Sequence, residues 1–499
     1  MSPRWESAEI DGGGKVEFDV EMRMEGGMKH VYFSRDRSSV VAFFHNTNDQ
    51  ALRESRLLKV VNQFNPTRAG QANADYWSDL FCWPSAILRH KTFGMGIKLP
   101  VYSSCFRFQM GELKGCEKDG GWFNCMDRKT NRLMRYSKVH ESERGNLQTY
   151  LAVFIRVARA VSRMHNAGLA HADLSERNVL IDPSTGRAVI IDLDSLVVTG
   201  MYPPEVLGTP GYIAPEVMAT KSLPLNDPRR KHPCAETDKY ALAVMIHKYL
   251  LERHPLEGRR VFPGASAEQE EENAHGVRAL YSEHPQDQAN RPIGDDWLRS
   301  AILGQKVEEL FRQTFVDGLV DPRRRPAAGE WETALDSAFG MLLACPNPNC
   351  THKFFVVTNA GQPKCPYCKS LYRGTYSILS MTHEEKGFTR SEGQLVLNGF
   401  RNGSGTRLYR FHLHRNQPRG AAQDNTAVLQ VVFLEKPAPT FYLQNLALPG
   451  MQVRMKGTSS DTFQPIPISA KVQLASGLEI IFGQDESARK GTVETRHFL

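Results

Sequence analysis

The stretch from His171 to Asp192 decides the fold. It opens with HADLSERNVLID and, after a short turn, ends with the apolar run AVIID. Asp173 and Asn178 stand five residues apart in the polar part, and Asp192 ends the apolar part. A carboxylate can position an attacking hydroxyl group and take its proton, and an amide and a second carboxylate can hold Mg²⁺ on phosphate oxygens. The pattern therefore predicts that a polar loop and a strand end bring these three side chains together.

This order of residues resembles the catalytic loop of protein kinases and the metal-binding aspartate that follows it. The resemblance implies that Asp173 is the catalytic base and that Asn178 and Asp192 are magnesium ligands. Downstream, the sequence GTPGYIAPE from Gly208 to Glu216 is similar to the end of a kinase activation segment. Small-molecule kinases share the catalytic loop but lack this segment, so the resemblance favours a protein substrate.

The resemblance also implies supporting roles. Asp238, in a buried helix, is expected to anchor the backbone of the catalytic loop, and Arg325 is expected to pair with Glu216. Thr209 is expected beside the acceptor hydroxyl. Ala172 replaces the arginine that usually precedes the catalytic aspartate and binds a phosphorylated activation segment. Phosphorylation of that segment is therefore not expected to switch the protein on.

The phosphate grip departs from the family pattern. Kinases carry a glycine-rich loop over the phosphates, whereas this chain offers only Gly26 and Gly27. Kinases also carry a lysine in a Val-Ala-x-Lys strand, but Phe44 stands at that position. We expect Lys29, beside the glycines, to hold the α and β phosphates with Glu54 as its ion-pair partner. The alternative is that Lys29 is a solvated turn residue.

Two further departures concern the nucleotide site. The segment LPVY, with Leu99 and Val101, is expected to hold the adenine base, although its proline removes one backbone donor. Asp192 and Asp194 form an Asp-Leu-Asp sequence where kinases carry Asp-Phe-Gly. Asp194 is either a second metal ligand or a cap of the following turn.

Hydrophobic periodicity predicts the order of elements. Strands are expected at residues 16–24, 30–34, 40–44, 82–90 and 95–102, and helices at 49–63, 147–166, 238–253, 306–317 and 329–343. Residues 111–145 and 254–300 are interpreted as loops. The result is a mainly β lobe followed by a mainly α lobe.

Four of the nine cysteines lie close together in the sequence, as CPNPNC from Cys345 to Cys350 and CPYC from Cys365 to Cys368. Two short pairs on tight turns are typical of a zinc ribbon with four thiolate ligands. Because four protein ligands leave no open position, we expect a structural ion. An iron site or a redox pair is the alternative.

Composition narrows the class of protein. The chain has 499 residues, too many for one core, and 62 basic against 55 acidic residues give a net charge of +7. So small a surplus, without a long basic run, does not favour nucleic-acid binding. The N-terminus lacks the apolar core of a signal peptide, and no apolar stretch is long enough to span a membrane. We therefore expect a cytoplasmic protein without a membrane segment.

Residues 372–499 alternate short apolar strands with glycine and proline turns, which is typical of a β-sandwich. The sequences FYLQNL, from Phe441, and ASGLEIIFG, ending at Gly483, resemble the last strands of a forkhead-associated domain. That resemblance implies binding of phosphothreonine peptides, but the motif that binds the phosphate is not matched here. A β-rich interaction domain is the alternative.

The expected fold class is α+β, with a bilobal kinase-like fold, a small zinc ribbon and a β-sandwich-like domain. In chain order, the expected domains are a leader and first strand 1–24, the kinase N-lobe 25–102, the kinase C-lobe 103–340, the zinc ribbon 345–370 and a β-rich or forkhead-associated-like domain 372–499.

The arrangement is similar to kinases of bacterial tellurite-resistance gene clusters. That similarity implies a Ser/Thr protein kinase in a stress or signalling system that uses ATP, Mg²⁺ and Zn²⁺. It also implies a protein substrate or partner, such as a von Willebrand-type protein or a phosphatase. The alternative is a pseudokinase that binds ATP and recruits partners.

Overall fold

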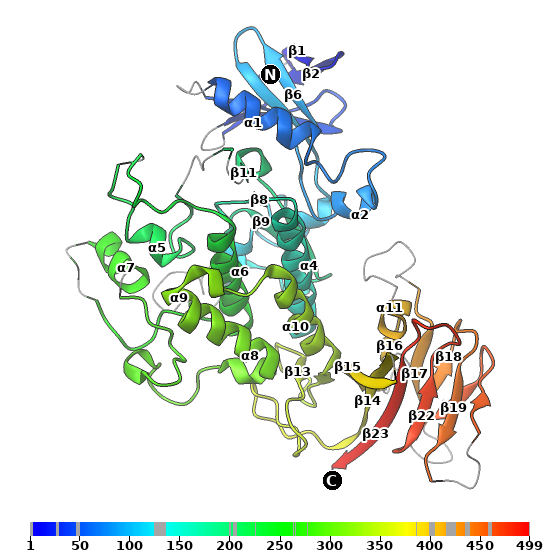
Figure 1. Ribbon diagram of the computed structural model, residues 1–499. Coiled ribbons are helices and arrows are strands. Elements are labelled where there is room, and N and C mark those ends of the chain that lie inside the picture. Colours follow the sequence, from blue (N-terminus) through cyan, green and yellow to red (C-terminus); the bar gives the residue numbers. More distant parts are fainter. Residues whose placement is uncertain are drawn as a thin grey trace. The chain divides into compact units, whose positions relative to one another are not determined.

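The computed structural model describes most of the chain (Figure 1). The described residues are 3–25, 29–45, 50–123, 136–198, 201–202, 207–224, 226–262, 264, 266–276, 278–385, 387–398, 405–415, 426–434, 440–457 and 462–498. The chain divides into two compact units, one of residues 1–300 and 306–333 and the other of residues 301–305 and 334–499. Each unit has its own fold.

The first unit begins with a seven-stranded antiparallel sheet in the order β2-β1-β6-β7-β5-β4-β3. Its strands are β1 Trp5–Ile10, β2 Lys15–Asp19, β3 Met24–Glu25, β4 Lys29–Phe33, β5 Ser39–Phe44, β6 Ala86–His90 and β7 Gly94–Pro100. The prediction of a leader and one strand over residues 1–24 was wrong, because β1 and β2 form a hairpin. Positive φ angles at Gly12, Gly13 and Gly14 allow the tight turn between them.

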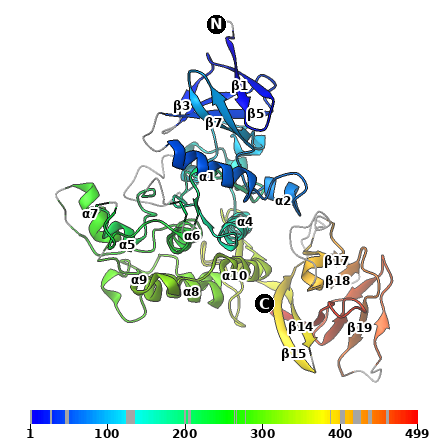
Figure 2. The ribbon, with the colours of Figure 1, turned by 45° about the horizontal axis from the view of Figure 1, so that its top comes forward.

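Helix α1, Gln50–Asn62, packs on this sheet (Figure 2). Its residues Leu57 and Val61 are buried against Ala42, Ile87 and Ile97 of three central strands. Leucine and valine three or four residues apart place both side chains on one face of the helix. The predicted helix at 49–63 is therefore confirmed over the described residues. A short helix, α2 Ala74–Ser78, follows it.

The rest of the first unit is mainly helical. Its helices are α4 Leu147–Asn166, α5 Pro215–Met218, α6 Ala235–Leu250, α7 Ala267–His275, α8 Gln305–Arg312, α9 Gly318–Val320 and α10 Ala328–Gly340, the last of which extends into the second unit. Helix α4 begins with a capping box in which Asn146 and Thr149 satisfy each other's backbone amides. Helix α6 is buried on nearly every face, as its apolar centre predicts. Helix α7 lies within residues 254–300, so the interpretation of this whole segment as a loop was wrong. The helix was missed because its glutamate-rich sequence has little apolar periodicity.

Two small antiparallel sheets hold the polar loop that contains Asp173 and Asn178. Strand β8, Leu169–Ala170, pairs with β11, Val197–Val198, and β9, Val179–Asp182, pairs with β10, Arg187–Ile190. The loop joins β8 to β9, and Asp192 lies just beyond β10. This pairing fixes both ends of the loop.

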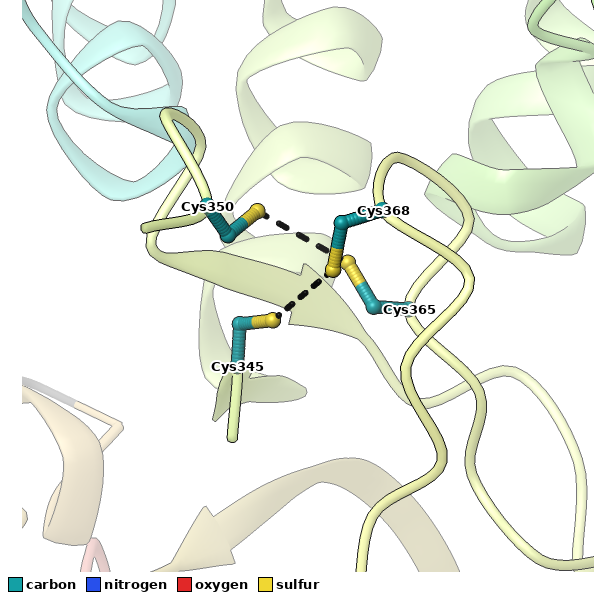
Figure 3. Close-up of side chains that lie close together, drawn as sticks. All are labelled: Cys345, Cys350, Cys365 and Cys368. Carbon is teal, nitrogen blue, oxygen red and sulfur yellow. Dashed lines mark hydrogen bonds between the residues drawn. The ribbon is translucent and has the colours of Figure 1, made fainter. Parts of the chain in front are cut away.

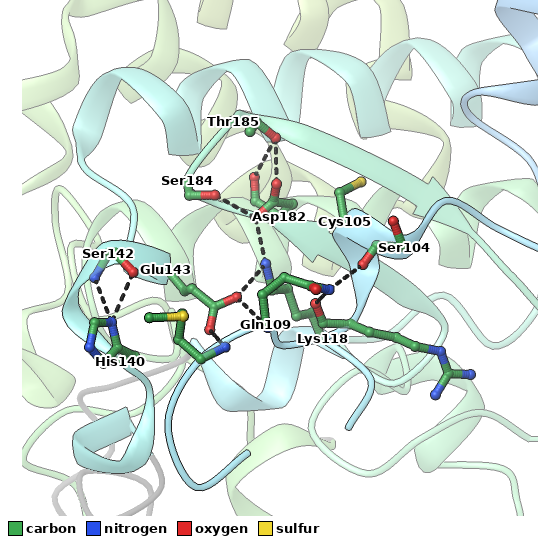
Figure 4. A network of polar contacts seen from close by, with 12 residues as sticks. Ser104, Cys105, Gln109, Lys118, His140, Ser142, Glu143, Asp182, Ser184 and Thr185 are labelled. Atoms are coloured by element: carbon green, nitrogen blue, oxygen red, sulfur yellow. Dashed lines mark hydrogen bonds and ion pairs between the residues drawn. The ribbon is translucent and has the colours of Figure 1, made fainter. Parts of the chain in front are cut away.

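Two described parts of the segment before α4 are tied to β9 by a buried ion-pair network (Figure 4). The Lys118 ammonium lies 2.8 Å from Asp182 Oδ1 and 3.1 Å from Glu143 Oε1, and all three side chains are at most 6% exposed. Ser184 and Thr185 donate hydrogen bonds to Asp182. Because an unpaired charge at this depth would be costly, the network fixes residues 118 and 143 to β9.

The second unit combines the cysteine segment with the β-rich tail. Strands β12 Leu342–Ala344 and β13 Phe354–Val356 form a small hairpin sheet. A six-stranded sheet contains β14 Gly374–Glu385, β15 Phe388–Leu397, β19 Gln452–Met455, β20 Gln464–Pro465, β22 Leu478–Ile481 and β23 Lys490–Phe498. A four-stranded sheet contains β16 Arg407–Leu408, β17 Leu429–Leu434, β18 Thr440–Asn445 and β21 Lys471–Gln473, and a short helix, α11 Arg410–Leu413, follows β16.

Both larger sheets of the second unit contribute to one hydrophobic cluster. Leu379 and Ile480 come from the six-stranded sheet, and Leu408, Val431 and Leu443 come from the four-stranded sheet, all fully buried. Two antiparallel sheets that share a core bury the alternate residues of each strand. The alternating strands predicted for the tail are therefore present.

Among the described helices, none has both the length and the apolar character needed to cross a bilayer.

Candidate active site

The backbone of the polar loop is held by one buried carboxylate, that of Asp238. Asp238, on α6, is 1% exposed and accepts hydrogen bonds from the backbone N–H groups of His171, at 2.7 Å, and Ala172, at 3.0 Å. His165 Nε2 lies 3.1 Å from the same carboxylate. Ala172 has a positive φ of 69°, which a residue with a Cβ adopts only at a cost. The expected anchoring role of Asp238 is confirmed, and the anchor stabilises this unfavourable backbone.

Asp173, the expected base, is oriented by two neighbours. Asn178 Nδ2 donates to the Asp173 carboxylate at 3.0 Å and to its backbone carbonyl at 2.8 Å. Thr209 Oγ1 donates to the other carboxylate oxygen at 2.7 Å. Because the amide nitrogen of Asn178 is directed at Asp173, its amide oxygen remains available to a metal ion.

Asp192 is linked to the same loop through the backbone. The Ile191 N–H donates to the Asn178 carbonyl at 3.0 Å, and His171 Nε2 lies 3.0 Å from the Ile191 carbonyl. Asp192 itself has a left-handed backbone, with φ 61° and ψ 45°. These hydrogen bonds join the loop to the strand end, so Asp173, Asn178 and Asp192 belong to one connected part of the structure.

Lys29 reaches this element from the sheet. It lies on β4, and its ammonium is 2.7 Å from Asp192 Oδ1 and 2.6 Å from Asp194 Oδ1. Burial alone would lower the pKa of Lys29, but the two carboxylates outweigh burial and raise it. Burial would likewise raise the pKa of Asp192, but the nearby ammonium lowers it. Lys29 is therefore a charged side chain at the site and not a solvated turn residue.

The expected ion pair between Lys29 and Glu54 is not present, so that part of the prediction was wrong. Glu54 is paired with Arg89 on β6, which also binds Asp11. The sequence showed one acidic residue on α1 but could not show that Arg89, from a different strand, lies closer to it. Lys29 has two carboxylates from the strand end instead.

The remaining nucleotide-site predictions concern the LPVY segment and the pair Gly26 and Gly27. Leu99 is half-buried beside a hydrophobic cluster that includes Leu180 and Val189, so an apolar surface is present next to the LPVY segment. Val101 is 41% exposed. Gly26 and Gly27 lie outside the described residues.

A buried polar cluster of Lys248, Glu176 and Tyr212, which was not predicted from the sequence, links the polar loop to the activation segment and to α6. Lys248, on α6, donates to Glu176 at 3.0 Å and to the Tyr212 hydroxyl at 2.9 Å, and that hydroxyl donates to Glu176 at 2.8 Å. The signal was a lysine two residues beyond the apolar run of α6, on a helix buried on nearly every face, where a charge requires a partner. Arg325 completes the support, because its guanidinium makes two bonds to Glu216, at 2.8 and 2.7 Å, as expected.

The four clustered cysteines converge in the second unit (Figure 3). All four sulfur atoms lie within 4.8 Å of one another, with Cys345 3.4 Å from Cys368 and Cys350 4.0 Å from Cys365. Sulfur atoms at the corners of a Zn–S₄ tetrahedron are about 3.8 Å apart. The donor set therefore fits a tetrahedral metal ion.

Comparisons with known proteins agree with the catalytic geometry. Residues 123–330 match the family described as the protein kinase domain. The serine/threonine-protein kinase PknD of Chlamydia felis is 26% identical over 140 residues, which cover 24% of this chain and 14% of that protein. A dual serine/threonine and tyrosine protein kinase of Xenopus tropicalis is 35% identical over 92 residues, which cover 18% of this chain and 10% of that protein. The chain thus spans only a small part of these relatives.

Solved structures include two kinases that align over much of the chain. The kinase PK-1 of the Cydia pomonella granulovirus aligns with 63% of this chain and 92% of its own, at a TM-score of 0.38 and 13% identity. A rhoptry antigen kinase domain of Toxoplasma gondii aligns with 67% of this chain and 86% of its own, at a TM-score of 0.39 and 14% identity. The family match rests on the sequence: residues 123–330 match the protein kinase domain, and this match supports a protein-kinase-like phosphotransferase.

Proposed function

We propose that this protein is an ATP- and Mg²⁺-dependent Ser/Thr protein kinase. The observation that carries the proposal is the position of Asp173, whose carboxylate is held by Asn178 and Thr209 on a loop anchored by Asp238. A fixed carboxylate of this kind can orient a substrate hydroxyl and accept its proton.

The roles of the other residues follow from their chemistry. Asn178 and Asp192 would hold Mg²⁺ through oxygen atoms, and the ion would neutralise charge on the phosphates. Lys29 would bind the α and β phosphates. The segment around Leu99 and Val101 would hold the adenine, and Gly26 and Gly27 would cover the phosphates.

The test is phosphate transfer from labelled ATP to the protein itself and to casein. We expect incorporation by the wild type and its loss in Asp173→Asn, with ATP affinity retained. The matched control is Asp119→Asn, at the cap of a 3₁₀ turn outside the site. Transfer by Asp173→Asn at the wild-type rate would contradict the proposal. Phosphoamino-acid analysis separates Ser/Thr from Tyr acceptors.

A second function, a pseudokinase that binds ATP without transferring phosphate, is favoured by one observation. Glu54 does not reach Lys29, so the usual Lys–Glu pair is not formed. ATP binding by a wild type that transfers no phosphate to any acceptor tested would support this alternative.

The second unit would recruit partners. We propose that Cys345, Cys350, Cys365 and Cys368 bind a structural Zn²⁺ ion, and that the two sheets form a sandwich-like domain related to forkhead-associated domains. The proposed partner is a protein, of the von Willebrand or phosphatase type that the sequence resemblance implies. Pull-down of a candidate partner by residues 334–499 and by the full chain tests this role.

A further inference from the structure

Two carboxylates contact Lys29, and they differ in how far solvent reaches them. The side chain of Asp192 is 42% exposed, whereas that of Asp194 is 5% exposed. An incoming metal ion with its own water molecules needs an accessible carboxylate, which Asp192 offers. Asp194 is buried in the short 3₁₀ turn Leu193–Ser195, and its Oδ1 lies 2.6 Å from the Lys29 ammonium.

Helix α1 does not provide a carboxylate for Lys29. Its Glu54 is bound to Arg89, and the guanidinium of its Arg53 lies 4.8 Å from the centre of the Phe44 ring. Lys29 lies 5.8 Å from the same ring. Helix α1 therefore brings a cation, and not a carboxylate, to the Phe44 ring that Lys29 also approaches.

A charged ammonium that is 15% exposed loses much of its hydration and requires a lasting partner. Asp192 cannot be that partner throughout the reaction if it binds Mg²⁺, because the ion competes for its oxygens. We propose that Asp194 is the positioning residue for Lys29 and takes the place that a helix glutamate holds in other kinases. This inference rests on the proposed kinase function and excludes both of the roles considered from the sequence, a second metal ligand and a turn cap.

The test compares Asp194→Asn, Asp194→Glu and the matched control Glu54→Gln. Three quantities are measured: KM for ATP, kcat, and the Mg²⁺ concentration that gives half-maximal activity. Loss of one charged hydrogen bond predicts that Asp194→Asn raises KM for ATP by about tenfold or more. The Mg²⁺ requirement is expected to stay within about twofold, and Glu54→Gln is expected to match the wild type. Asp194→Glu, which keeps the charge, is expected to recover part of the affinity.

Three results would overturn the inference. A higher Mg²⁺ requirement in Asp194→Asn with unchanged KM for ATP would make Asp194 a metal ligand. Unchanged kinetics in a folded Asp194→Asn would make it a bystander, and a loss in Glu54→Gln alone would return the role to α1. Equilibrium binding of ATP to the same variants keeps the inference testable if the wild type transfers no phosphate, so it can fail separately from the proposed function.

Discussion

Lys29 lies directly opposite Phe44 in the antiparallel pairing of β4 and β5. Strand β5 carries Phe44 where the kinase sequence pattern has a lysine, and β4 carries Lys29 at the same level of the sheet. Lys29 lies 2.7 Å from Asp192, so β4 places a cation where the proposed phosphate contact requires one.

Exchanging these two positions tests the relationship. We expect Lys29→Met to lower ATP affinity by about tenfold or more, because a charged contact to phosphate is lost. Adding Phe44→Lys to Lys29→Met is expected to restore part of the affinity, measured by equilibrium binding. Lys15→Met, on the exposed side of β2, is the control. Wild-type affinity in Lys29→Met would show that another cation binds the phosphates.

The anchor of the catalytic loop provides the second prediction. Asp238 accepts bonds from two backbone amides, and asparagine at this position keeps only one acceptor oxygen. We expect Asp238→Asn to lower the free energy of unfolding by about 2–4 kcal/mol and to reduce kcat. Ala172→Gly is the matched variant, because glycine adopts the positive φ without strain, and it is expected to cause no loss of stability. A stable, fully active Asp238→Asn would contradict the anchoring role.

Much of the catalytic half could be predicted because its information is local. The residues from Asp173 to Asp192 lie within one loop and one hairpin, so their spacing in the sequence fixes their spacing in the structure. The partners of Lys29 and Glu54 could not be predicted in this way. Lys29 contacts residues 163 and 165 positions away, and Arg89 approaches Glu54 only because β6 and α1 lie on the same sheet.

The third prediction concerns metal in the second unit. Cys350 and Cys365 pack in one cluster with Tyr376 and Ile378 of β14, so the proposed ion would stabilise the start of the tail as well as the cysteine turns. We expect about one zinc per chain by elemental analysis, with loss in Cys365→Ser and after treatment with a strong chelator. Proteolysis within the second unit is expected to be faster in Cys365→Ser and in the chelator-treated protein than in the untreated wild type. Cys116→Ser, exposed in the first unit, is the control, and a full metal complement in Cys365→Ser would contradict the four-cysteine site.

The last prediction uses a buried histidine to make stability depend on pH. His247, on α6, is fully buried, with Nδ1 2.8 Å from the Arg253 carbonyl and Nε2 3.8 Å from Glu283. Burial and the nearby Arg253 guanidinium lower the pKa of His247 to about 4. The unfolded chain, with a histidine pKa of about 6.5, therefore binds more protons than the folded chain between these values.

The contribution of His247 to the free energy of unfolding should therefore be complete above pH 6.5. It should fall by about 3 kcal/mol as the pH drops toward 4. Glu283, whose pKa is also lowered, acts in the same direction. All six tryptophans lie between Trp5 and Trp331, so tryptophan fluorescence during chemical unfolding reports on the first unit alone. We expect His247→Gln to lose less stability than the wild type between pH 7 and pH 4.5, because glutamine does not ionise. The exposed variant His140→Gln should follow the wild type, and equal losses in all three proteins would show that His247 does not carry the effect.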